Sequence, residues 1–237
     1  CADLQICPGR PAMLAGYGAS GKTLALQSLV LSCATGRPIW GPLRRGGPIT
    51  ARHVDHEQGQ HATRGRYQRL AIGLGISADE LGEAERSRRL ALASFPGVYL
   101  NRDGAEDAYT AAFEGVDLVI IDALRGATPG TDENDSQIRE CIDTLTRVSE
   151  RTGAAFVLIH HAGKPRDEHA DVRTVLRGSS AIFDACGSVF VLAGAKGEPK
   201  HMAHAKAAAE SAGGMVEDFY LAIEDVPANG SPTGGVR

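Results

Sequence analysis

The sequence predicts an α/β fold, with a mostly parallel central sheet, flanking helices and an antiparallel extension near the C-terminus. Short apolar runs alternate with segments of helical periodicity, which is typical of strands joined by crossover helices. Three of the apolar runs end in polar residues, as expected where the carboxyl ends of strands line a ligand site. At 237 residues, the chain is long enough for one large domain.

The N-terminal part of the chain predicts two strands that alternate with two helices. PAMLA (11–15) is expected to form a strand, and GKTLALQSLVLSCATG (21–36) a helix that Gly36 ends. PITARHVDH (48–56) is the next predicted strand, and residues 59–75 form the next predicted helix. This alternation favours an α/β sheet over an all-β or all-α arrangement.

Two buried strands and a helix are predicted in the middle of the chain. VDLVIID (116–122) and AAFVLIHH (154–161) are short apolar runs of the kind that form strands covered on both faces. Residues 134–153 lie between them and have helical periodicity, with Asn134 or Asp135 as the expected N-cap.

The C-terminal part predicts antiparallel strands. The charged segment 162–180 is expected to be a mobile loop that leads into the strand GSVFVLAG (187–194). The alanines of HMAHAKAAAESAGG (201–214) favour a helix, but its position before DFYLAIEDV (218–226) favours a strand entering a hairpin. We expect the strand.

The composition is that of a globular protein. Hydrophobic residues make up 43% and charged residues 23%, and the formal net charge of −4 argues against coating nucleic acid by charge alone. The five scattered cysteines fit a reduced, cytoplasmic compartment, and neither an export signal nor a membrane-spanning run is evident. We predict one domain over residues 1–225 and, from its linker composition, a flexible tail over residues 226–237.

Residues 16–23, GYGASGKT, match the phosphate-binding loop pattern G-x-x-x-x-G-K-[ST] between a predicted strand and a predicted helix. Backbone N–H groups in such a loop wrap a phosphate at a helix N-terminus, the lysine reaches the β and γ phosphates, and the hydroxyl holds Mg²⁺. The predicted nucleotide-binding residues are Gly16, Gly18, Ala19, Ser20, Gly21, Lys22 and Thr23.

Acidic residues at two other strand ends supply the remaining chemistry. Asp122 follows four aliphatic residues and is predicted to lie on the Mg²⁺ side of the nucleotide, whereas Asp117 starts the same strand and is expected to be structural. Asp55 and Glu57 are both candidates for polarising the attacking water. We choose Glu57 because it lies further out, where the nucleotide would sit.

With these residues in order, the chain from Ala12 to Asp225 resembles the RecA-like P-loop ATPases, and among them the hexameric-helicase branch that includes RepA and DnaB-type helicases. The resemblance implies ATP and Mg²⁺ as cofactors, a homo-oligomeric ring and single-stranded DNA as partner. It also implies a catalytic role for Glu57, since the family's catalytic glutamate ends the strand after the phosphate-loop helix.

The family carries a γ-phosphate-sensing residue at the end of the strand after Asp122, and VLIHH resembles this through His160 and His161. Adjacent residues on a strand face opposite ways, so only one histidine can point at the nucleotide, and the two cannot chelate one metal ion together. We assign His161 as the sensor and His160 to packing. The resemblance further implies that Arg66 covers the adenine, with Arg64 and Arg69 as less favoured choices.

LRGSSAIFDA resembles a family segment after the second loop, which places Arg177 near DNA, a neighbouring subunit or its own loop. RepA-like chains carry an arginine just beyond this segment, where the present chain has Gly187. We therefore predict that Lys206 acts on the ATP of the adjacent subunit, with Lys200 in reserve. The basic residues of segment 163–177 make it a possible DNA loop.

The leading hypothesis is a Mg-ATP-hydrolysing ring ATPase, in its strongest form a RepA-like replicative DNA helicase of a plasmid, phage or mobile element. The alternatives are a non-helicase DNA-binding ATPase and a KaiC-like nucleotide-gated signalling ATPase.

Overall fold

The structure is a computed structural model. The residues that it describes are 4–38, 40, 47–132, 136–162, 180–195, 197–207, 214–228 and 231–237. The predicted N-caps Asn134 and Asp135, and the predicted DNA loop with Arg177, lie outside these residues.

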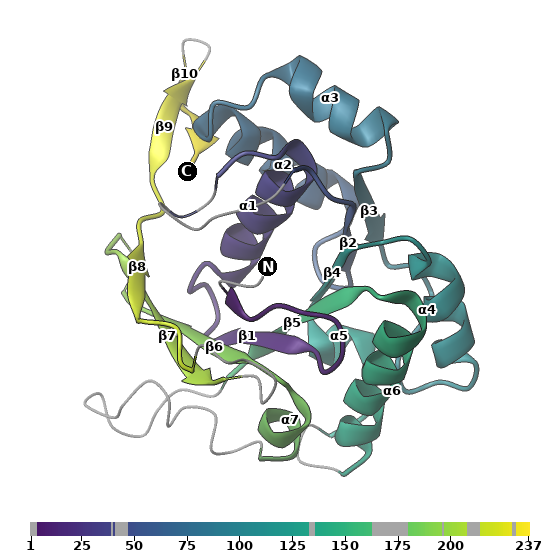
Figure 1. The fold of residues 1–237 in the computed structure, drawn as a ribbon. Coiled ribbons are helices and arrows are strands. Elements are labelled where there is room, and N and C mark those ends of the chain that lie inside the picture. Colours follow the sequence, from purple (N-terminus) through teal and green to yellow (C-terminus); the bar gives the residue numbers. More distant parts are fainter. Residues whose placement is uncertain are drawn as a thin grey trace.

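A central eight-stranded sheet organises the chain, with the strand order β3-β2-β4-β5-β1-β6-β7-β8 (Figure 1). The first six strands of this order run parallel, and the last two are antiparallel to their neighbours. The parallel strands are β1 (Ala12–Gly16), β2 (Ala51–Asp55), β3 (Leu90–Ser94), β4 (Leu118–Asp122), β5 (Ala155–His161) and β6 (Val189–Ala193). The antiparallel strands are β7 (Lys200–Lys206) and β8 (Phe219–Leu221). The predicted fold class is confirmed, and so is a strand in the first half of segment 201–214.

Helices cover both faces of this sheet, as a parallel sheet requires. On one face lie α1 (Lys22–Thr35), α2 (Gln60–Gly73) and α3 (Ala78–Arg86). On the other lie α4 (Ala105–Phe113), α5 (Leu124–Ala127), α6 (Ser136–Thr152) and α7 (Ser180–Ala185). None of these helices is long and apolar enough to cross a membrane, as far as the described ranges extend.

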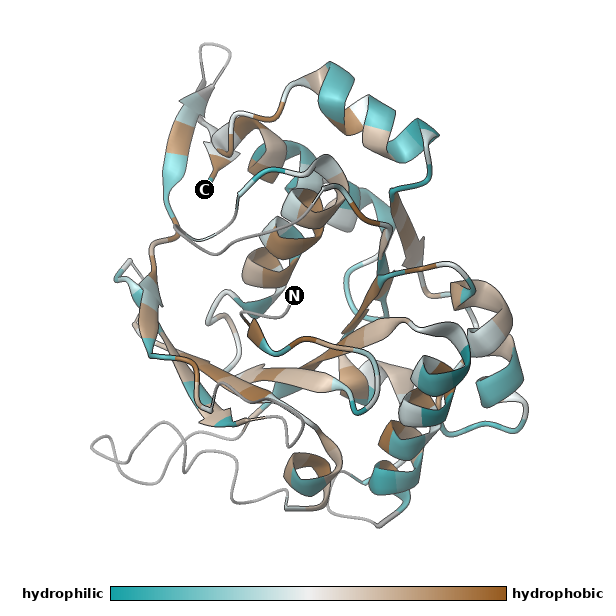
Figure 2. Cartoon of the chain, viewed as in Figure 1, coloured by the Kyte–Doolittle hydropathy of each residue, from teal (hydrophilic) through white to brown (hydrophobic). Residues whose placement is uncertain are grey.

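Side chains that alternate along the strands pack into two hydrophobic cores, one on each face of the sheet. Leu14 and Ile120 pack on the α1 face, whereas their neighbours Met13 and Ile121 pack on the α6 face. Strands β1 and β6 and helix α1 are mostly hydrophobic in Figure 2, whereas α3 and α6 carry long hydrophilic stretches. Helix α1 is buried almost all round and follows directly on the loop after β1, so its N-terminus lies at the end of that central strand.

Three elements between α2 and β4 were not predicted: α3, β3 and α4. A capping box does mark the start of α3, since the Glu80 amide donates to the Ser77 hydroxyl over 3.2 Å and the Glu80 carboxylate accepts from the Ser77 amide over 2.9 Å. The edge strand β3 is only five residues long and only partly buried, so its apolar signal is weak.

The predicted flexible tail is wrong for the described residues, which form a hairpin of β9 (Asp225–Ala228) and β10 (Ser231–Val236). The hairpin packs on α2, where Val236 is buried and Arg69 pairs with Asp225 at 2.9 Å. Glycine and proline, which suggest a linker, are equally compatible with a short hairpin once an apolar partner such as Val236 has a surface to cover.

Gly73, in the last turn of α2, gives a test of this packing. A Cβ at Gly73 would lie 1.9 Å from the Val236 carbonyl oxygen, whereas a Cβ at Gly65 in the same helix would meet no atom within 4 Å. We expect Gly73→Ala to displace the hairpin and destabilise the protein by about 1–3 kcal/mol, and Gly65→Ala to stabilise it by about 0.5–1 kcal/mol. Chemical denaturation measures both, and a Gly73→Ala protein as stable as Gly65→Ala would contradict the hairpin's position.

Candidate active site

The predicted polar residues meet at one edge of the sheet because four of the strands that carry them are neighbours. In the order β2-β4-β5-β1, Asp55 lies beside Asp122, and Gly16 lies beside His161. The carboxyl ends of these parallel strands form a single edge, as expected of a ligand site in an open α/β sheet.

Steric constraints explain the two fixed glycines of the phosphate loop. A Cβ at Gly16 would lie 2.3 Å from the Leu192 carbonyl oxygen, a backbone atom that cannot turn aside. A Cβ at Gly21 would meet only the end of the Ile223 side chain, and there the φ of 97° is what disfavours other residues. Gly18, at a variable position of the motif, faces open space and has no such constraint.

Lys22 is buried within the loop that it serves. Its Nζ donates to the carbonyl oxygens of Gly16 at 2.9 Å and Tyr17 at 2.6 Å. Burial lowers the pKa of Lys22 to about 8, and the negative charges of Asp122 and Glu57 oppose this shift without cancelling it. A phosphate group arriving at the loop would therefore meet a desolvated ammonium, which attracts anions more strongly than an exposed one does.

A cavity of about 260 Å³ opens over the loop. It is lined by residues 19–24 together with Glu57, Gln58, Arg66 and His161. Glu57 and His161 touch there, with 2.9 Å between Glu57 Oε1 and His161 Nε2. The structure thus brings together most of the predicted nucleotide-binding and catalytic residues, which come from the phosphate loop, the turn after β2, β5 and α2.

Asp122 has the features of a carboxylate that binds a cation. It is 1% exposed, and neither carboxylate oxygen has a hydrogen-bond partner among the described residues. His53 Nε2 lies 3.5 Å from Oδ2, and both side chains are buried. A buried carboxylate whose oxygens accept no hydrogen bond is unfavourable unless a cation or water completes it. Asp122 is not among the residues that line the cavity, whereas Thr23 is, and a carboxylate and a hydroxyl are groups that hydrated Mg²⁺ can bind.

Asp55, the alternative to Glu57, does not line the cavity. Its carboxylate is 1% exposed and accepts four hydrogen bonds from its own chain. Burial alone would raise the pKa of Asp55, but these hydrogen bonds outweigh burial and hold the pKa below its ordinary value. Asp55 is thus committed to the fold, which leaves Glu57 as the carboxylate that faces the cavity.

The two histidines at the end of β5 have different environments. His161 is about one-third exposed and contacts Glu57, whereas His160 is buried. Burial, with smaller contributions from His161 and Lys22, lowers the pKa of His160 to about 4, so this side chain is neutral at ordinary pH. Unlike His161, His160 is not among the residues that line the cavity.

Of the three arginines on α2, only Arg66 lines the cavity. Its Nη2 donates to Gln58 Oε1 at 3.1 Å. Arg64 pairs with Glu85 and Arg69 with Asp225, both away from the cavity. The sequence prediction did not include Gln58, although its place directly after Glu57 was the available signal.

Lys206 lies away from the cavity of its own chain. It pairs with Val189 at the start of β6. Lys206 therefore lies at the amino-terminal ends of the parallel strands, opposite the end that leads into the phosphate loop. Its Nζ donates to the carbonyl oxygens of Phe183 at 2.8 Å and Asp184 at 3.1 Å. Burial lowers the pKa of Lys206. To act on a neighbouring subunit, this side chain would have to leave the end of α7.

The structure also places Lys200, the reserve candidate for the trans-acting residue, and Gly187, which stands where RepA-like chains carry an arginine. Lys200 is buried and donates to the carbonyl oxygens of Gly194 and Ala195, so it has no free surface to present to a neighbour. A Cβ at Gly187 would lie 3.1 Å from the Arg10 carbonyl oxygen, and the Gly187 amide donates to the Pro11 carbonyl. The N-terminal segment therefore fills the space where a larger residue would stand.

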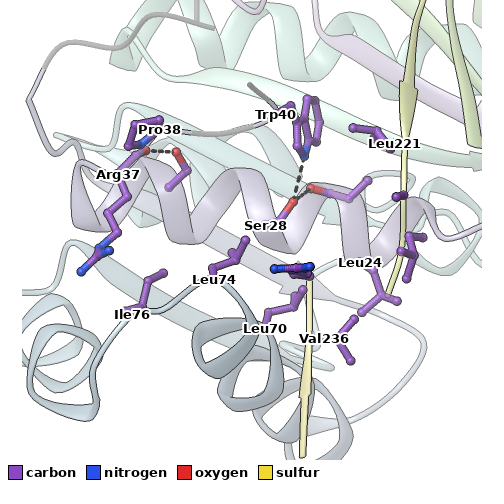
Figure 3. Close-up of a pocket in the computed structure, with 15 residues that line it drawn as sticks. Leu24, Ser28, Arg37, Pro38, Trp40, Leu70, Leu74, Ile76, Leu221 and Val236 are labelled. Carbon is purple, nitrogen blue, oxygen red and sulfur yellow. Dashed lines mark hydrogen bonds between the residues drawn. The ribbon is translucent and has the colours of Figure 1, made fainter. Parts of the chain in front are cut away.

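A second cavity, of about 210 Å³, shares the lining residue Leu24 with the first. Figure 3 shows the side chains that line this second cavity. It is mainly apolar and lies between α1, α2 and the C-terminal residues, with Leu70, Leu74 and Ile76 along one side. The Trp40 indole N–H donates to the Ser28 hydroxyl at 3.1 Å. Sequence patterns could not reveal this cavity, because it is closed by Leu221 and Val236 from the distant C-terminus.

The sheet order, the glycine loop and the acidic residues at the strand ends together define a RecA-like P-loop ATPase. The family model described as an AAA domain, AAA_25, matches residues 5–167, and the chain belongs to this family. A comparison with curated protein sequences gave no match.

Solved structures share the fold at low sequence identity. The flagellar accessory protein FlaH from Methanocaldococcus jannaschii is 13% identical with a TM-score of 0.61, over 98% of this chain and 90% of FlaH. A DnaB-like replicative helicase, described with its interactions with primase, is 12% identical with a TM-score of 0.66. That match covers 98% of this chain but only 57% of the helicase. A third structure, solved as an ATPase domain, is 12% identical with a TM-score of 0.59, over 97% of this chain and 84% of that domain.

The lowered pKa of Lys22 predicts how phosphate binding depends on pH. Because binding needs the charged ammonium, ADP affinity measured without Mg²⁺ should be constant well below pH 8 and fall above it, by up to about tenfold per pH unit. Titration calorimetry from about pH 6.5 to about pH 9.5 in two buffers of different ionisation enthalpy measures both the affinity and the proton uptake. Lys22→Arg should abolish this dependence, and a wild-type affinity that does not change over that range would contradict the shift.

Proposed function

We propose that this protein hydrolyses Mg-ATP in a homo-oligomeric ring and couples hydrolysis to movement on single-stranded DNA, as a cytoplasmic, RepA-like replicative helicase. The observation that carries the catalytic part is the contact between Glu57 and His161 beside the phosphate loop. The AAA-domain family and the likeness to a DnaB-like helicase and to a solved ATPase domain support the wider assignment.

The loop binds the phosphates. Backbone amides around Gly18–Thr23 and the Lys22 ammonium hold the negative charge, and Thr23 with Asp122 would hold Mg²⁺. When bound, Mg²⁺ neutralises charge on the β and γ phosphates. Arg66 also lines the cavity, and its planar guanidinium can lie over the base.

Glu57 is the base in this proposal. Its carboxylate takes a proton from water as the water oxygen bonds to the γ phosphorus and the bond from that phosphorus to the bridging oxygen breaks, leaving ADP and phosphate. His161 can donate Nε2–H either to Glu57 or to a γ-phosphate oxygen. Because these two acceptors compete for one donor, His161 can report the presence of the γ-phosphate to Glu57.

Lys206 remains our proposal for the residue that acts on the neighbour's ATP. Its Nζ would have to give up the hydrogen bonds to the Phe183 and Asp184 carbonyl oxygens and bind a phosphate of the ATP held by the neighbouring subunit. A cation supplied in this way stabilises charge on the transferring phosphoryl group, which makes turnover depend on assembly.

A second candidate function is a nucleotide-gated ATPase without DNA. The likeness to FlaH favours it, since the match covers 90% of a protein that is named as a flagellar accessory protein. The net charge of −4 is compatible with it as well. In that case ATP turnover would switch contacts with another protein.

Substitution of the base tests the mechanism. We expect Glu57→Gln to lower the ATPase rate by about 10²–10⁴-fold while ATP affinity stays within about threefold, because the phosphate loop is unchanged. Steady-state phosphate release and binding of a fluorescent ATP analogue measure the two effects. Glu114→Gln, an exposed position beyond α4, is the matched control and should behave as wild type. Full turnover in Glu57→Gln would remove Glu57 from its role.

A second experiment separates the two functions. We expect single-stranded DNA to stimulate the ATPase rate by about tenfold or more, and a non-hydrolysable ATP analogue to assemble the protein into rings, as measured by light scattering. A DNA-independent rate without ring formation would exclude the helicase assignment and favour the nucleotide-gated ATPase.

A further inference from the structure

Asp55 is a buried carboxylate without a cationic partner among the described residues, held by hydrogen bonds alone. Its Oδ1 accepts from the backbone amides of Glu57 at 2.9 Å and Gln58 at 2.8 Å. Its Oδ2 accepts from the hydroxyls of Thr63 at 2.5 Å and Ser94 at 3.1 Å. Four donors satisfy the charge, so the carboxylate can stay ionised at 1% exposure.

These bonds join three parts of the chain around one turn. Residues 56–58 form the turn, Thr63 lies in the first part of α2, and Ser94 ends β3. The backbone reinforces the junction, since the Phe95 amide donates to the Asp55 carbonyl at 2.8 Å and the His56 amide donates to the Asp122 carbonyl at 2.6 Å. The turn therefore has little freedom once Asp55 is in place.

The turn carries two side chains that line the cavity, Glu57 and Gln58. Both have their amide nitrogens bound to the same oxygen of Asp55, so the carboxylate sets the direction in which their side chains leave the backbone. A general base must be held to within a fraction of an ångström of its productive position, and a misplacement of about 1 Å can lower the rate about 10²-fold.

We propose that Asp55 is the positioning residue for Glu57: it clamps the turn so that the Glu57 carboxylate meets the γ-phosphate side of the cavity and His161. This inference rests on the proposed ATP hydrolysis. Ser94 and Thr63 contribute to the same positioning, because their hydroxyls bind Asp55 Oδ2 and so hold the carboxylate against β3 and α2.

A purely structural cap would behave differently. If Asp55 served only to start α2, its removal would lower stability and reduce nucleotide binding and turnover together. If it acts through Glu57, its removal should lower kcat much more than nucleotide affinity, because the four hydrogen bonds of its carboxylate involve no residue of the phosphate loop and reach the cavity lining otherwise only at the Gln58 backbone.

The test measures kcat, KM and nucleotide affinity for Asp55→Ala and Asp55→Asn. We expect Asp55→Ala to lower kcat by on the order of 10- to 100-fold with affinity within about threefold. Asp55→Asn should recover part of this loss, because its amide oxygen can still accept from both backbone amides. Ser94→Ala removes one of the four hydrogen bonds and should give a smaller loss of kcat. It replaces Asp55→Ala in the test if that variant does not fold.

A double-mutant cycle with Glu57→Gln decides whether the effect passes through Glu57. In that background, Asp55→Asn should cause little further loss. A full additional loss, or a loss of kcat matched by an equal loss of affinity, would overturn the inference.

Hydrogen exchange separates this inference from the proposed function. The amides of Glu57 and Gln58 should be protected in the wild-type protein and should exchange at least about tenfold faster in Asp55→Ala, whether or not ATP is hydrolysed. A protein without ATPase activity that shows this pattern would refute the function and leave the clamp intact. Unchanged exchange in Asp55→Ala would refute the clamp itself.

Discussion

The parallel pairing of β2, β4, β5 and β1 is the constraint on which the rest of the structure depends. Parallel strands need crossover helices, and these helices bury both faces of the sheet. A strand buried on both faces can place charged residues only where it leaves the core. Polar residues of the candidate site are therefore gathered at the carboxyl ends of these strands, where Gly16, His161, Asp122 and Asp55 follow one another across neighbouring strands.

Three buried charges at this edge are stabilised in three ways, and the difference indicates their roles. Carbonyl oxygens of the loop surround Lys22, which leaves its positive charge for an arriving phosphate. Amides and hydroxyls satisfy Asp55, so its charge is used within the chain, where it holds the turn that carries Glu57. Among these three, only Asp122 has carboxylate oxygens without a hydrogen-bond partner in the described chain. A buried negative charge of this kind is unfavourable unless a cation or water binds it.

Much of the fold was predictable because its signals are local. Continuous apolar runs indicated the central strands, and the phosphate-loop motif indicated the strand, turn and helix around Lys22. The edge strand β3 was missed because a short, half-exposed strand has little apolar contrast. The C-terminal hairpin was mistaken for a tail because its stability comes from α2 and Val236, which are far apart in the sequence.

The sequence by itself determined the class of the fold, the phosphate loop and the set of acidic and histidine residues at the strand ends. The sequence favoured Glu57 over Asp55 and His161 over His160, but only the tertiary structure decided that Glu57 and His161 line one cavity in mutual contact while Asp55 is held by hydrogen bonds beneath the turn. The physical reason is that orientation and hydrogen bonding depend on distant partners: His161 is 104 residues from Glu57, and Ser94 is 39 residues from Asp55. No pattern within a single segment encodes these contacts.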